Sequence, residues 1–152
     1  MDARSPAVQV LDRQRAVRGI ARRARSVATR CLREIGREGS ALTVLLTDQA
    51  GIRSLNRRYL ERDGATDVIA FPADATDEAG RPYLGDVAVS VEQALEQAPV
   101  YGNTVEEEVA VLVIHGILHL LGMDHETDAG EMRAREREIH GRLLRRRARA
   151  RR

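Results

Sequence analysis

Several features are missing from this 152-residue chain, and each absence excludes a class of protein. A single cysteine, Cys31, cannot form a disulfide within the chain, which is typical of proteins from a reducing compartment. The longest apolar stretch, from Val109, is interrupted by His115 and His119, so no membrane span is expected. The N-terminus also lacks the apolar run of a signal peptide. We therefore expect a soluble, cytoplasmic protein with one domain over residues 1–152.

Lysine is absent, and the arginines that carry all the basic charge gather at the two ends of the chain. Residues 1–40 hold ten arginines and four acidic residues (+6), and residues 132–152 hold ten and two (+8). Residues 61–131 hold two arginines and sixteen acidic residues (−14), and residues 41–60 contribute +2. The lack of lysine indicates a GC-rich genome. The basic tail at about 145–152 is either an arm that contacts RNA or a solvated tail.

Hydrophobic periodicity predicts strand, helix, strand and helix in the first part of the chain. Residues 7–12 are a short strand, and residues 41–47 are a second one by their length and β-branched content. From Asp12, apolar and small residues recur at three-four spacing as far as residue 35, which predicts one helix that ends at the glycines just beyond. Asp48 can cap the next helix. The predicted buried edge of that helix is Ile52, Leu55 and Tyr59.

The next segment predicts two strands and a short helix. Residues 66–72 are a short strand that Pro72 closes, and residues 73–84 are a loop or a loose hairpin. Residues 85–91 alternate in polarity as a strand does, and residues 91–98 continue as a short helix.

Two further helices complete the chain. Thr104 and Glu107 have the spacing of a capping box, which opens the apolar helix that carries the histidines. An Arg- and Glu-rich helix begins at about Asp128. Four strands and five helices in this order predict an α+β domain, in which helices pack against one sheet.

Three of the four histidines lie within residues 115–125, which read HGILHLLGMDH. In a helix His115 and His119 project from the same face one turn apart, within reach of one metal ion. Gly122 stands where a helix C-cap turns left-handed, and this turn would bring His125 back toward the other two. The spacing is that of a metzincin zinc site, with Gly116 at the position of the usual glutamate. The alternative is a set of buried histidines that bond to their neighbours.

Zinc suits three neutral imidazoles, and we expect one ion per chain. No fourth ligand is obvious. Cys31 lies on the core face of the first predicted helix, and His140 lies far along the last one. Three protein ligands with one open position describe a catalytic zinc site. Because peptide hydrolysis needs a proton donor for the leaving amine, the lack of glutamate at 116 favours a phosphodiester substrate.

Three blocks resemble the YbeY family of bacterial endoribonucleases, which are rRNA maturation factors. HGILHLLGMDH closely resembles the family signature H-G-x-L-H-L-x-G-x-D-H. LNRRYLERDGATDVIAFP (55–72) is similar to the block L-N-x-x-Y-R-x-x-D-x-x-T-D-V-L-S-F-P, and LGDVAVSVEQA (84–94) to a segment that contains L-G-D-I-x-I-S. The three blocks keep the family's order and cover most of residues 41–132.

This resemblance implies a mixed sheet of about four strands with packed helices and a zincin-like metal helix. It also implies a single zinc ion on His115, His119 and His125, and a role in 16S rRNA 3′-end maturation and ribosome quality control. The expected partner is single-stranded rRNA, together with the small ribosomal subunit and its proteins. We expect a metal-dependent hydrolase of phosphodiester bonds. A zinc metallopeptidase and a non-catalytic, ribosome-associated zinc protein are the alternatives.

The sequence departs from the family pattern at two positions. Leu60 replaces the arginine that follows the tyrosine, and Ala70 replaces the serine before Phe-Pro. Arg62 is our candidate for the role of the missing arginine. The alternative is that Arg62 is a solvated charge on a loop. Arg58 also flanks the gap.

Three aspartates are further candidates. Asp124 either orients a ligand histidine or shapes a turn. Asp67 and Asp86 lie beside predicted strands, where they either border the substrate groove or stabilise strand ends and turns.

Overall fold

The computed structural model describes residues 6–61, 64, 66–124 and 126–144 of the chain. Arg62, His125 and the tail at 145–152 lie outside these residues, so the predictions made for them stay predictions.

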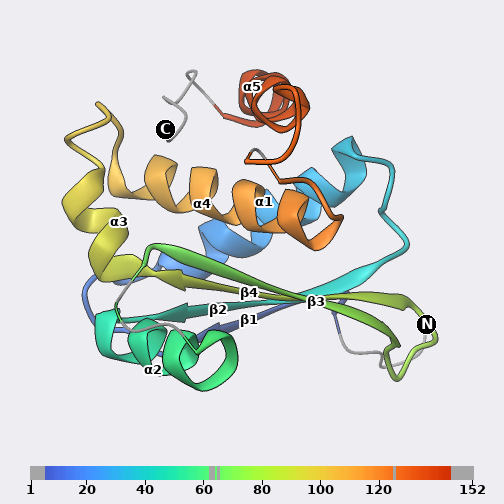
Figure 1. Ribbon diagram of the computed structural model, residues 1–152, viewed down its shortest axis with the longest axis horizontal. Coiled ribbons are helices and arrows are strands. Elements are labelled where there is room, and N and C mark those ends of the chain that lie inside the picture. Colours follow the sequence, from blue (N-terminus) through green and yellow to red (C-terminus); the bar gives the residue numbers. More distant parts are fainter. Residues whose placement is uncertain (1–5, 62–63, 65, 125, 145–152) are drawn as a thin grey trace.

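The centre of the molecule is a mixed four-stranded sheet, as expected (Figure 1). The strands β1 (Val8–Asp12), β2 (Ala41–Thr47), β3 (Val68–Thr76) and β4 (Pro82–Ser90) lie in the order β1-β2-β4-β3. β1 pairs in parallel with β2 and β2 with β4, whereas β3 pairs antiparallel with β4. The α+β prediction is therefore confirmed.

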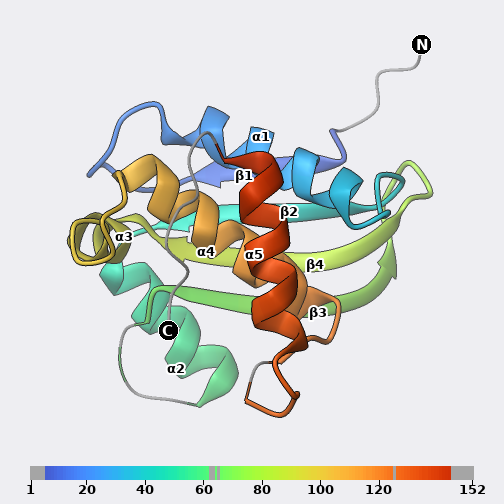
Figure 2. The same ribbon diagram turned by 90° about the horizontal axis from the view of Figure 1, so that it is seen from above.

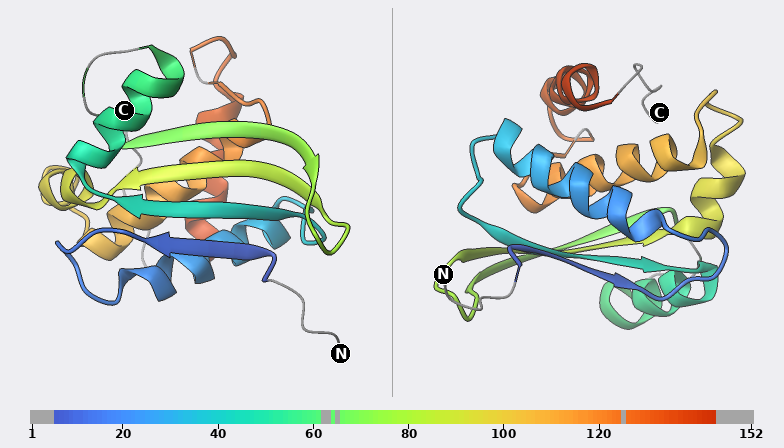
Figure 3. Two further views of the ribbon diagram at one scale, coloured as in Figure 1. Left: turned by 90° about the horizontal axis from the view of Figure 1, so that it is seen from below. Right: turned by 180° about the vertical axis from the view of Figure 1, so that it is seen from behind.

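Helices cover the two faces of the sheet unequally. α1 (Ile20–Glu34) and α4 (Val105–Leu120) contact each other on one face, and α5 (Glu131–Leu143) crosses above them (Figures 1 and 2). α2 (Gln49–Leu60) lies alone against one end of the opposite face, and α3 (Val91–Gln97) lies at the end of the sheet (Figure 3). In the described parts of the chain no helix is long and apolar enough to span a membrane.

α4 is the central element of the core. All but three of its sixteen residues are buried, because the sheet, α1 and α5 surround it. This position explains why its sequence is apolar on every side. The predicted capping box is present, with the Glu107 carboxylate accepting from the Thr104 backbone N–H at 2.8 Å and the Thr104 hydroxyl accepting from that of Glu107 at 3.1 Å. The start of the histidine helix is thus set locally.

The predicted end of β3 at Pro72 is wrong. The strand continues through Pro72 to Thr76 and pairs with β4 from Pro82, so of the two alternatives for residues 73–84 the hairpin is confirmed. β3 lies at the sheet edge, where a proline removes no ladder hydrogen bond, and the register shifts between Pro72 and Ala75.

The predicted helix starts are also too early. α1 begins at Ile20 because Gln14 bonds both the N–H and the C=O of Val17, at 3.0 and 2.7 Å, and Gly19 is left-handed (φ 79°). α5 begins at Glu131, after a left-handed Gly130 (φ 104°).

On α2, Ile52 is buried as predicted, but Leu55 is only half-buried and Tyr59 is 59% exposed. The Tyr59 ring instead meets the ring of Phe71 edge to face, with 5.7 Å between their centroids.

Candidate active site

The C-terminal half of α4 places two of the predicted ligands side by side. The Nε2 atoms of His115 and His119 lie 3.1 Å apart, and their rings meet edge to face at 4.6 Å between centroids. His115 is buried, whereas His119 is partly exposed. Two imidazole nitrogens on one tetrahedral zinc, each about 2.0–2.1 Å from the ion, are roughly 3.3 Å apart. The observed pair therefore fits a shared metal ion.

The turn after α4 has the geometry that the glycine predicted. Gly122 is left-handed (φ 88°), its N–H donates to the carbonyl of His119 at 2.9 Å, and that of Met123 donates to the carbonyl of Leu118 at 3.1 Å. These two bonds form a Schellman motif, which reverses the chain just before position 125. Within the described ranges, which omit His125, no three His, Cys, Asp or Glu side chains are grouped to hold a metal. The third ligand thus stays a prediction.

A residue that the sequence analysis missed, Glu136, completes the described part of the site. Its Oε2 lies 2.9 Å from Nδ1 of His115, and both side chains are buried. A detectable signal existed in the sequence. Glu136 belongs to the buried stripe of α5, where a carboxylate is rare unless it has a partner. The other members of that stripe are Met132, Ile139, His140 and Leu143.

Gly116 faces the sheet. A Cβ at this position would lie 2.4 Å from Cγ1 of Val87 and 3.3 Å from Cγ2 of Val68. Glycine is therefore required by the close approach of α4 to β4 and β3. A glutamate at 116 would be forced into the helix–sheet interface.

The candidate aspartates make contacts within the fold. One Asp124 carboxylate oxygen accepts from the backbone N–H of Glu126 at 3.0 Å, as in an Asx turn. Buried Asp67 accepts from the side-chain amide of Gln97 at 3.1 Å, which ties the start of β3 to α3. Asp86 is exposed and accepts from the hydroxyl of Tyr83, on the face of the sheet away from α4. These contacts show structural roles and leave the proposed site roles untested.

The two residues at which this sequence departs from the family pattern lie apart from each other. Leu60 is the last residue of α2 and is 40% exposed. Ala70 packs against the main core, on the α4 side of the sheet. The guanidinium of exposed Arg58 stands 6.0 Å from the centroid of the Tyr59 ring.

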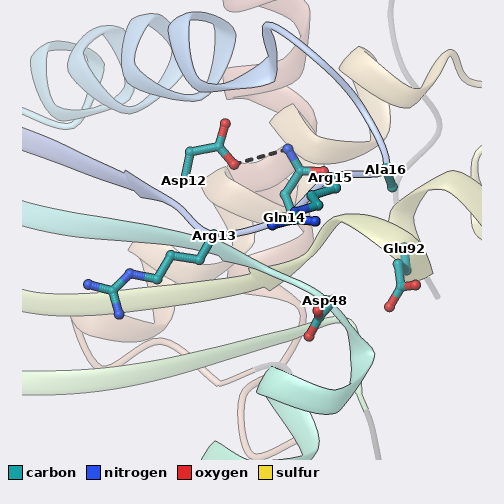
Figure 4. A pocket seen from close by; sticks show the side chains of 7 residues that line it. All are labelled: Asp12, Arg13, Gln14, Arg15, Ala16, Asp48 and Glu92. Atoms are coloured by element: carbon teal, nitrogen blue, oxygen red, sulfur yellow. Dashed lines mark hydrogen bonds between the residues drawn. The ribbon is translucent and has the colours of Figure 1, made fainter.

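Two hollows lie away from the histidines. One of about 540 Å³ lies on the sheet face that α2 partly covers. Its lining residues are Gln9, Leu11, Thr43, Leu45, Leu55, Tyr59, Phe71, Asp86 and Ala88. The other, of about 480 Å³, lies at the carboxyl ends of β1 and β2, where Gln14 bonds Asp12 at 3.0 Å (Figure 4). The rest of its polar lining is Arg13, Arg15, Asp48 and Glu92. Of the predicted site residues, only Asp86 lines either hollow.

Comparison with known proteins decides the family. A family model described as Endoribonuclease YbeY matches residues 9–144. The chain belongs to the YbeY family. It is 41% identical over 116 residues to Endoribonuclease YbeY of Solibacter usitatus, a match that covers 76% of this chain and 74% of that protein. It is 49% identical over 106 residues to the Roseiflexus sp. (strain RS-1) protein of the same name, covering 63% and 66%.

A solved structure supports the fold. The solution structure of TM1509 from Thermotoga maritima matches with a TM-score of 0.60 at 25% identity, over 87% of this chain and 85% of that one. The resemblance inferred from the three sequence blocks is thus confirmed, and the chain belongs to a family of RNA-cleaving hydrolases.

Proposed function

We propose that this chain is a zinc-dependent endoribonuclease that cleaves single-stranded RNA in 16S rRNA 3′-end maturation and ribosome quality control. One observation carries the proposal: in a YbeY-family chain, the Nε2 atoms of His115 and His119 face each other at 3.1 Å. His125, which follows the reversing turn, would supply the third ligand. Zinc, when bound there, supplies a Lewis acid that lowers the pKa of a water to about 7 and polarises a phosphoryl oxygen.

The protein's own residues support this chemistry from two sides. His115 is buried in the core, and His119 is partly exposed, so His119 is the more accessible of the two to an RNA strand. Arginine guanidinium groups match the geometry of phosphate oxygens. Arg62, just beyond the end of α2, is our candidate for the charge that the family's arginine supplies and that Leu60 cannot.

The position of Gly116 argues against a peptidase of the metzincin type. Such an enzyme needs a carboxylate beside the metal for proton transfer to the leaving amine. Residue 116 points into the contact with Val87 instead of toward the histidines. A non-catalytic zinc protein would use the same ligands, so only activity separates it from the proposed enzyme.

Metal analysis tests the centre. We expect one zinc per chain in the wild type, and loss of that zinc in His119→Ala. The matched control is Glu126→Gln, which changes another potential ligand in the neighbouring turn. This variant should keep its zinc. Metal at the wild-type level in the triple variant His115→Ala/His119→Ala/His125→Ala would refute the site.

Cleavage assays test the reaction class. A labelled single-stranded rRNA fragment should be cut by the wild type, protected by a chelator and cut again after zinc is restored. Unfolded casein should remain intact under the same conditions. Chelator-sensitive casein cleavage with intact RNA would favour the peptidase, and zinc binding with neither activity would favour the non-catalytic protein.

A further inference from the structure

The contact between Glu136 and His115 joins two elements that are far apart in the sequence. α5 crosses above α4 (Figure 2). Glu136 of α5 contacts His115 of α4 there. Glu136 is only 4% exposed and His115 only 6%. Burying a carboxylate is unfavourable unless a partner compensates for the lost hydration. Oε2 of Glu136 finds such a partner in Nδ1 of His115, at 2.9 Å.

The geometry sets the direction of the hydrogen bond. A carboxylate only accepts, so Nδ1 of His115 carries the proton and donates it to Glu136. In a ring protonated at Nδ1 alone, Nε2 presents a lone pair, and this atom is the one that faces Nε2 of His119 at 3.1 Å. The ring is thus held in the tautomer that a metal ion requires.

We propose that Glu136 is a positioning residue that fixes the tautomer and orientation of His115 and strengthens its binding of zinc. This inference rests on the proposed zinc site and adds a carboxylate from α5 to it. A carboxylate that accepts from the distal N–H of a ligand histidine raises the basicity of that ligand.

A second titratable side chain of the buried stripe, His140, interacts electrostatically with both Glu136 and His115. His140 is one turn further along the helix and is 1% exposed. Burial lowers the pKa of His140, an effect that Glu136 opposes and His115 reinforces. A neutral His140 does not cancel the negative charge of Glu136.

Zinc competition against a chromophoric chelator is the first test. Glu136→Ala should weaken zinc binding about 10- to 100-fold. Glu136→Gln, whose amide oxygen still accepts from Nδ1–H but carries no charge, should show a smaller loss. Glu138→Gln is the matched control, since Glu138 is an exposed carboxylate on the same helix that pairs with Arg135 and Arg142, and it should bind zinc as the wild type does.

A spectroscopic test separates positioning from mere attachment of α5. In metal-free protein with ¹⁵N-labelled histidines, His115 should be the Nδ1–H tautomer in the wild type and a mixture in Glu136→Ala. If Glu136 only attaches α5, its variants would unfold at lower temperature with unchanged zinc affinity and tautomer, and the proposal would be overturned. If Glu136→Ala does not fold, the Gln variant decides by the same two measurements. If the wild-type protein binds no zinc, the proposed function on which this inference rests would be refuted instead.

Discussion

At the scale of single residues, Gly116 shows how one position carries two different meanings. Because Gly116 follows a predicted ligand histidine, its lack of a side chain indicates that the catalytic glutamate of a metzincin is missing. In the folded chain the same glycine lets α4 approach β4, because a Cβ would lie 2.4 Å from Val87. The identity of this residue is therefore set by packing, and its effect on chemistry follows from that packing.

Gly116→Ala should accordingly destabilise the protein by about 1–3 kcal/mol, the usual cost of overpacking a core. The measurement is the free energy of unfolding in urea. Gly141→Ala is the matched control, because Gly141 is exposed in α5 and alanine there should stabilise the helix by up to about 1 kcal/mol. Equal stability of Gly116→Ala and wild type would mean that α4 is not held this close to the sheet.

Cys31 is fully buried in α1, and burial raises the pKa of its thiol to about 12, with Glu34 adding to the shift and Arg135 opposing it. Because the thiolate is the reactive form, Cys31 should not react with a disulfide reagent at pH 8 in the native state. One thiol per chain should react after unfolding. Rapid reaction of the native protein would place Cys31 at the surface.

At the scale of elements, α5 is the helix that links the core to the site. Its buried stripe contains two ionisable side chains, Glu136 and His140, among apolar ones. The stability of its docking should therefore respond to pH.

The pKa of His140 is lowered, chiefly by burial, so the unfolded chain binds more protons than the native one below about pH 6.5. The stability of metal-free protein should thus fall as the pH is lowered from 7.5 to 5.5. His140→Leu should reduce this fall, since leucine does not titrate. Urea unfolding at several pH values measures it, and equal slopes for both proteins would contradict the assignment to His140.

At the scale of the whole molecule, the fold brings the two basic ends of the chain together. Nη2 of Arg135 in α5 donates to the backbone carbonyl of Glu34 at the end of α1, at 3.1 Å, and Arg142 pairs with the Glu34 carboxylate. Both helices lie on the face of the sheet that carries the histidines. The arginine-rich helices α1 and α5 thus lie side by side.

RNA affinity should come mainly from the arginines of the first helix and of the C-terminal tail. Binding of single-stranded RNA should fall with salt at a log–log slope of about −0.7 per neutralised phosphate. Removal of residues 145–152, which lie outside the described structure and hold six arginines, should weaken binding similarly across sequences and flatten the slope. A variant with these arginines replaced by serine separates charge from chain length. Unchanged affinity and slope in both would show that the tail does not contact RNA.

Local patterns in the sequence determined most of the elements and part of the site. The capping box at Thr104, the left-handed turn at Gly122 and the one-turn spacing of His115 and His119 each involve residues a few positions apart. Contacts within one helix turn depend on backbone geometry alone, so a pattern predicts them. The three family blocks added the mixed sheet and the class of enzyme.

Contacts between distant segments were decided only by the tertiary structure. The partner of Glu136, the steric requirement at Gly116 and the meeting of α1 with α5 depend on which helix crosses which. The passage of β3 through Pro72 likewise depends on its place at the sheet edge. Periodicity shows which face of an element is buried, but the surface that covers this face comes from another part of the chain.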